Sequence, residues 1–145
     1  MLRGHHPATV DAKGRLKIPA DFLGELREFG EKFYVTSESG DCAIVYPLKV
    51  WDDIEAKLKN IPRHSKAKKK YLDITNYYGQ LVELDGQGRL LLPAVLREAA
   101  QMAGEVTVLG NQDHLMIWNK ARFQDRLRTN PYSTEDEKEL FDLGL

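Results

Sequence analysis

Two aspartate–arginine pairs in this chain, each four residues apart, have the chemistry to recognise a phosphate or the edge of a base. They are Asp11 with Arg15 and Asp85 with Arg89. A guanidinium group donates two parallel hydrogen bonds to a phosphate or to the O6 and N7 atoms of guanine, and an aspartate behind it can hold it in position. A surface ion pair of small energetic value is the simpler alternative. That alternative does not explain why both copies carry arginine where lysine would serve equally.

Both pairs belong to a ten-residue phrase that occurs twice, as DAKGRLKIPA at residues 11–20 and as DGQGRLLLPA at residues 85–94. A repeat of this kind indicates that one structural unit has been used twice. Aspartate at the first position and glycine at the fourth are typical of a type I β-turn, and Gly14 and Gly88 can take the positive φ that closes a bulged hairpin. We therefore expect the aspartates to cap turn amides rather than to act as an acid–base pair.

The residues around each phrase predict the same order of elements in both halves: hairpin, helix, hairpin, helix. Pro19 and Pro93 suit the first position of a helix, and apolar residues at helical spacing follow each of them. Gly30 and Gly104 are placed to end these helices. Further strands are expected at 33–36, 42–46, 106–109 and 114–118, and closing amphipathic helices at 48–58 and 121–127.

The composition fits a single compact domain, or two halves that share one core, since the chain has 145 residues of which 42% are hydrophobic. The net charge of −1 hides a segregation, because residues 131–145 carry −4 and the other 130 residues therefore carry +3. A solvated tail is one interpretation of the acidic end. Competition for a basic surface of the same protein is the other.

Several classes of protein are disfavoured by the sequence. No apolar run approaches the roughly 20 residues of a membrane span, and no signal peptide is recognisable, so a cytoplasmic location is expected.

The single cysteine, Cys42, excludes an intrachain disulfide, and its apolar neighbours favour a buried hydrophobic role. His5 and His6 point to opposite faces of a strand and make a poor metal chelate. We expect no metal ion, cofactor or small-molecule substrate, and an enzyme with an unrecognised site remains an alternative.

Residues 63–70, RHSKAKKK, form the densest basic stretch, with five positively charged side chains among eight residues. The stretch lies between the two halves. Two interpretations stay open: it forms the solvated first turn of a connecting helix, or it contacts phosphates.

The doubled Asp-x-x-Gly-Arg motif, with its following apolar residues and proline, resembles the SpoVT/AbrB-type DNA-binding module. Two tandem copies over 145 residues are similar to the MraZ family of bacterial transcriptional regulators. The resemblance implies an α+β fold, a tandem AbrB-like swapped-hairpin β-barrel with helices, whose two pseudo-symmetric halves form one compact domain. The expected division is repeat 1 at 5–50, a helical and basic connector at 51–78, repeat 2 at 79–122, and a C-terminal helix with the acidic tail at 123–145.

The same resemblance implies sequence-specific binding of double-stranded DNA, at repeated short sites in the promoter of the division and cell-wall gene cluster. It also implies ring-shaped homo-oligomers and association with the nucleoid. An AbrB-like antitoxin module that binds a toxin partner is the alternative, because the same fold serves in toxin–antitoxin pairs. The shortness of the acidic tail counts against that alternative.

The DNA-contacting positions of the family fall on the two aspartate–arginine pairs. Copy two has Gln87 and Leu91 where copy one has Lys13 and Lys17, so we expect the first hairpin to attract phosphates more strongly. The complete predicted interface consists of Asp11, Lys13, Gly14, Arg15, Lys17, Asp85, Gln87, Gly88 and Arg89.

Overall fold

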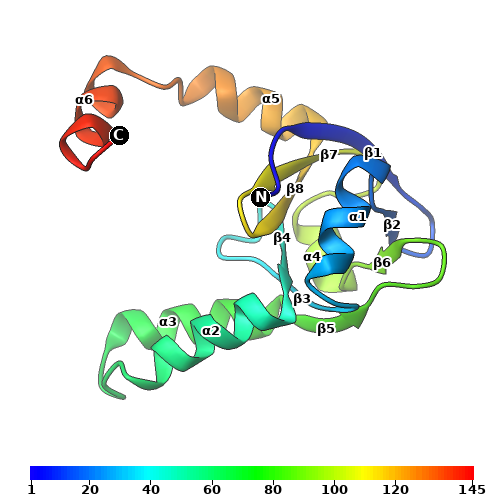
Figure 1. Cartoon of the computed structure of the whole chain (residues 1–145), viewed down its shortest axis with the longest axis horizontal. Helices are drawn as coiled ribbons and strands as arrows, with labels where there is room; N and C mark the ends of the chain where they lie inside the picture. Colours follow the sequence, from blue (N-terminus) through cyan, green and yellow to red (C-terminus); the bar gives the residue numbers. More distant parts are fainter.

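Eight β-strands and six helices make up the structure, a computed structural model that describes residues 1–145 (Figure 1). The strands are β1 His5–Val10, β2 Arg15–Lys17, β3 Lys32–Thr36, β4 Ala43–Pro47, β5 Gln80–Glu83, β6 Arg89–Leu91, β7 Gly104–Asn111 and β8 His114–Asn119. The helices are α1 Ala20–Glu28, α2 Leu48–Lys59, α3 Lys66–Tyr77, α4 Ala94–Ala99, α5 Lys120–Thr129 and α6 Thr134–Asp142. The predicted order of hairpin, helix, hairpin and helix is confirmed in both halves.

The first hairpin of each half pairs with the second hairpin of the other half. The sheet order is β5-β3-β4-β8-β7-β1-β2-β6, so β1 lies beside β7 and β5 beside β3. Strands β4 and β8 join the two second hairpins, and β2 pairs antiparallel with β6, with Leu16 opposite Leu90. This exchange is the swapped-hairpin arrangement that the resemblance implied, and neither half contains a complete sheet of its own.

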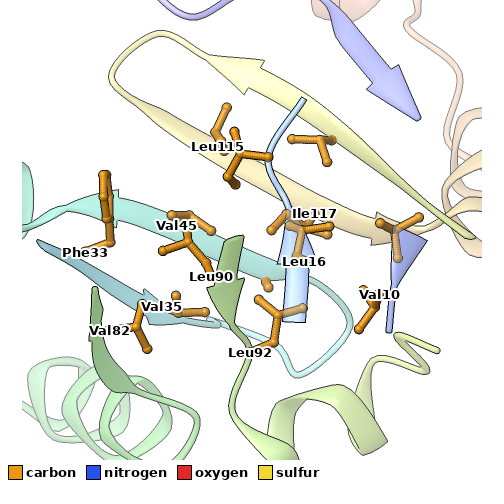
Figure 2. Packing of buried hydrophobic residues seen from close by; sticks show 14 of the residues in the cluster. Val10, Leu16, Phe33, Val35, Val45, Val82, Leu90, Leu92, Leu115 and Ile117 are labelled. Atoms are coloured by element: carbon orange, nitrogen blue, oxygen red, sulfur yellow. The ribbon is translucent and has the colours of Figure 1, made fainter. Parts of the chain in front are cut away.

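The two ends of the sheet, β5 and β6, are consecutive strands of one hairpin, so the sheet curls into a nearly closed barrel. The backbone N–H of Asp85 donates to the C=O of Arg89 at 3.0 Å and holds this hairpin together. The inward side chains form one core of 21 buried residues. Phe33, Val45 and Ile117 come from three different strands and converge there (Figure 2), so both halves contribute to one hydrophobic interior.

The prolines stand one residue earlier than the sequence suggested, because Pro19 and Pro93 are the N-cap residues of α1 and α4 rather than their first helical residues. Gly30 follows the C-cap of α1 with φ of +119°, as expected for a helix stop. The expectation for Gly104 is wrong, since α4 ends at Ala99 and Gly104 begins β7.

The left-handed residue after α4 is Gln101, which follows the C-cap Ala100 and has φ of +53°. Its N–H donates to the C=O of Glu98, and the N–H of Met102 donates to the C=O of Arg97 at 2.9 Å. This is a Schellman ending, which normally favours glycine at the left-handed position. Met102 is buried in the core, so tertiary packing holds the turn that Gln101 adopts.

Two helical extensions leave the barrel (Figure 1). Helices α2 and α3 form a hairpin that is anchored by a small buried cluster of Ile44, Tyr46 and Trp51. Helix α6 buries none of its residues and begins with a capping box between Ser133 and Asp136.

A helix long and apolar enough to cross a membrane is absent from the structure. The division of the chain at residues 51, 79 and 123 stays a prediction.

Leu90 and Leu91 are neighbours on β6 but face opposite sides, with 0% and 44% of their surfaces exposed. Leu90→Ala should lower the free energy of unfolding by about 2–5 kcal/mol, because it leaves a cavity in the core. Leu91→Ala should stay within about 0.5 kcal/mol of the wild type. Denaturant unfolding followed by circular dichroism measures both. Equal losses would contradict the observed register of β6.

Candidate nucleic-acid interface

The first turn is built around the carboxylate of Asp11. Its Oδ1 atom accepts hydrogen bonds from the backbone N–H groups of Lys13 and Arg15, both at 2.9 Å. The N–H of Gly14 donates to the C=O of Asp11 at 2.9 Å, and Gly14 has φ of +84°. The aspartate therefore caps the turn amides, as the sequence predicted.

The second turn repeats this geometry. Oδ1 of Asp85 accepts from the N–H groups of Gln87 at 2.8 Å and Arg89 at 2.9 Å. Gly88 donates to the C=O of Asp85 at 3.1 Å and has φ of +75°. The two halves therefore carry equivalent turns, in sequence and in three dimensions.

Each aspartate also holds its arginine through the second carboxylate oxygen. Oδ2 of Asp11 accepts from Nε of Arg15 at 2.8 Å, and Oδ2 of Asp85 accepts from Nε of Arg89 at 2.9 Å. The arginine side chains are 33% and 25% exposed. Their terminal nitrogens make no hydrogen bond within the chain. Each guanidinium is thus oriented at one edge and leaves its two Nη groups available for an external acceptor.

The turn hydrogen bonds also set the ionisation of the two carboxyl groups. The backbone N–H of Arg15 holds the pKa of Asp11 below its usual value of 3.8, against the opposing effect of desolvation. The backbone N–H of Arg89 has the same effect on the pKa of Asp85. Both groups are therefore carboxylates at neutral pH and can keep the arginines in place.

Pairing between β2 and β6 brings four side chains onto one outer surface. Arg15 lies opposite Leu91, and Lys17 lies opposite Arg89. The central residue of each strand is fully buried in the core, so the residues on either side of it point outward. We call this surface the β2–β6 face, defined by Arg15, Lys17, Arg89 and Leu91. A pseudo-two-fold axis relates Arg15 to Arg89 and Lys17 to Leu91.

The register changes one expectation from the sequence. Lys17 follows Arg15 in the chain, but its partner across the ladder is Arg89. The charge of Lys17 therefore lies beside Arg89 of the second hairpin as well as on the first hairpin, so both hairpins share it. Lys13 and Gln87 remain at the exposed tips of their turns. Their contact with DNA stays a prediction.

Arg97 is a residue near the first turn that the sequence did not reveal. It comes from α4 in the other half, and a Cβ atom at Gly14 would collide with its guanidinium group. Its Nε donates to the C=O of Leu92 at 3.0 Å. The second turn has Leu23 in the equivalent place, 3.0 Å from where a Cβ of Gly88 would lie. Only the exchange of hairpins brings a cation from residue 97 beside residue 14.

Two other features that the sequence singled out, Cys42 and the basic stretch at 63–70, lie outside the β2–β6 face. Cys42 is 5% exposed, and burial raises the pKa of its thiol to about 11, which confirms a buried hydrophobic role. The basic stretch at 63–70 includes the start of α3, where the Ser65 side chain caps the N–H of Lys68. Its cations are mostly exposed, so solvation and phosphate contact both stay open.

The nearly closed barrel of exchanged hairpins, with two outward aspartate–arginine turns, is an AbrB-like α+β fold of two repeated halves. Comparison with known sequences identifies the family within this fold. It belongs to the MraZ family, whose model, described as "MraZ protein, putative antitoxin-like", matches residues 1–74 and 79–143.

Curated relatives are similar over their full length. A protein of Acidobacterium capsulatum named transcriptional regulator MraZ is 50% identical, with 100% of each chain covered. Proteins of the same name from Koribacter versatilis and Thermoanaerobacter pseudethanolicus are 46% and 37% identical, and the alignments cover 100% and 98% of this chain and 100% and 97% of theirs. These relatives are named as regulators and not as enzymes.

The lowered pKa values make a prediction about stability and pH. A carboxyl group with a lower pKa in the folded state stabilises the fold above its unfolded pKa, about 3.9, and this contribution is lost as pH falls through the folded value. The double variant Asp11→Asn/Asp85→Asn should therefore be less stable than the wild type at pH 7, and the difference should shrink below about pH 4.

Thermal unfolding between about pH 7 and pH 2.5 measures this difference. Asp136, whose pKa is also lowered, is present in both proteins and cancels in the comparison. A difference that stays constant over the whole range would show that the two carboxylates are not the source.

Proposed function

We propose that this protein is a DNA-binding transcriptional regulator that reads guanine in the major groove with Arg15 and Arg89. The main observation behind this proposal is that each guanidinium group is held by a hydrogen bond at Nε and has both Nη atoms free. A guanidinium that is already oriented loses less conformational freedom on binding. Its two free donors match the O6 and N7 acceptors of guanine.

The shape of the surface supports the same conclusion. The major groove, about 12 Å wide, admits a two-stranded β-ribbon, and β2 and β6 form such a ribbon with both arginines on its outer side. Its pseudo-two-fold symmetry suits a DNA site whose two halves are nearly palindromic. Lys13, Lys17 and Arg97 add positive charge for phosphates, and such contacts fix register without reading sequence.

Membership of the MraZ family supports the finer parts of the proposal. We propose repeated short sites in the promoter of the division and cell-wall gene cluster as the DNA target, and the cytoplasm, at the nucleoid, as the location. No catalytic role is part of this function.

We also propose that the protein works as a ring-like homo-oligomer. One chain offers two arginine turns, and linking several chains raises the effective concentration at adjacent sites by enough to strengthen binding about 10²–10⁴-fold. Apolar side chains near the C-terminus support self-association, since Phe141 and Leu145 are 75% and 86% exposed. Exposed apolar clusters of this kind commonly mark interaction surfaces.

Binding of a toxin is the alternative role for the same C-terminal surface, since the family description includes the words "antitoxin-like". Co-purification of a small toxin in stoichiometric amount would favour it. The oriented arginines have no part in that role, so they favour the regulator.

Removal of the arginines tests the DNA-binding function. Arg15→Ala and Arg89→Ala should each reduce the preference for promoter DNA over random DNA by about 1–3 kcal/mol, the value of a bidentate guanine contact. Fluorescence anisotropy at fixed salt measures this preference. Arg128→Ala removes the same charge from an exposed site on α5 and should leave the preference unchanged. Wild-type preference in the double variant would overturn the proposal.

Light scattering tests the assembly. The wild type should have the mass of a large homo-oligomer, and Phe141→Ser/Leu145→Ser should have a smaller one, because apolar contact between chains is lost. Arg15→Ala/Arg89→Ala should keep the wild-type mass, since it alters only the reading surface. A wild type that is monomeric at the concentrations where it binds DNA would refute the oligomer.

A further inference from the structure

Leu91 is an exposed leucine on a surface whose three other residues, Arg15, Lys17 and Arg89, are cationic. It lies on the β2–β6 face opposite Arg15, and 44% of its surface is exposed. Its neighbours on either side in the chain, Leu90 and Leu92, are fully buried. The side chain of Leu91 therefore points away from the core, beside Arg15.

We propose that Leu91 reads a thymine through its 5-methyl group, at a base pair adjacent to the guanine that Arg15 contacts. This inference rests on the proposed function, because it requires the β2–β6 face to enter the major groove. Thymine alone among the four bases presents a methyl group there, and apolar side chains recognise it by contact.

The β2–β6 register determines which base pair this thymine occupies relative to the guanine that Arg15 contacts. Side chains directly opposite on an antiparallel pair have Cβ atoms about 4.5–5.5 Å apart, and neighbouring bases along one strand are about 3.4 Å apart. Leu91 and Arg15 can therefore reach adjacent base pairs at the same time. The arginine supplies the hydrogen bonds and the leucine the apolar contact, so the first half-site contains guanine and thymine side by side.

The second half-site has different chemistry. The pseudo-two-fold axis places Lys17 where the first half has Leu91, beside Arg89. An ammonium group is only a donor, so it selects a phosphate or a base acceptor and gains nothing from a methyl group. The site is consequently an imperfect palindrome, with guanine in both halves and the thymine requirement in one. Each subunit binds in a single orientation.

Replacement of thymine by deoxyuridine tests this inference, because it removes only the methyl group. The probe is a duplex selected by the wild type from a random-sequence pool, with each thymine replaced in turn. At one position, next to a conserved guanine, the wild type should bind the uracil duplex about fourfold more weakly, the value of one buried methyl group. Leu91→Ala should bind both duplexes equally.

Two further variants sharpen the test. Val95→Ala truncates a side chain that is similarly exposed, at 45%, on α4 outside the β2–β6 face, and it should keep the wild-type discrimination. Lys17→Leu should acquire a new thymine preference at the symmetry-related position. Denaturant unfolding of each variant verifies that it is folded.

The outcomes separate this inference from the function on which it rests. A wild type that selects a sequence but is indifferent to every uracil replacement overturns the role of Leu91 and leaves the regulator intact. Discrimination that persists in Leu91→Ala also overturns it. A wild type that selects no sequence overturns the proposed function itself.

Discussion

Each turn glycine hydrogen-bonds to the opposite half of the chain. The N–H of Ile18 donates to the C=O of Gly88, and the N–H of Leu92 donates to the C=O of Gly14, both at 2.9 Å. These two bonds bracket the short ladder between β2 and β6 and tie the tip of one hairpin to the base of the other. Each arginine is oriented by the aspartate of its own turn, but the placement of the two arginines on one outer face depends on this reciprocal contact.

Much of this arrangement could be predicted from short stretches of the sequence. Aspartate and glycine at turn positions predicted both hairpins, because an Asx-type turn is specified by residues that lie next to one another. The arginines as candidate readers followed from the same phrase. The swapped barrel and the DNA target did not follow from spacing, and came from the resemblance of the doubled phrase to a known module.

What the sequence could not reveal depends on contacts between the halves. The position of Lys17 beside Arg89 is set by the register of β2 against β6, and no local pattern encodes that register. Arg97 reaches Gly14 across the same boundary. The helix stop after α4 was missed for a related reason, since packing of Met102 holds Gln101 in the left-handed conformation where glycine would be expected.

The exchange of hairpins also governs how the chain can fold while it is being made. His5 at the start of β1 pairs with Leu109 in β7, so the edge of the first strand that faces away from β2 has no partner until the ribosome has synthesised most of the protein. At about 5–20 residues per second, this interval lasts roughly 5–20 s. During it the apolar faces and the unpaired edge of β1 are uncovered, a state open to association with other chains. Completion of the second half ends that exposure, so translation speed, more than the stability of the finished barrel, sets how long the nascent protein is vulnerable.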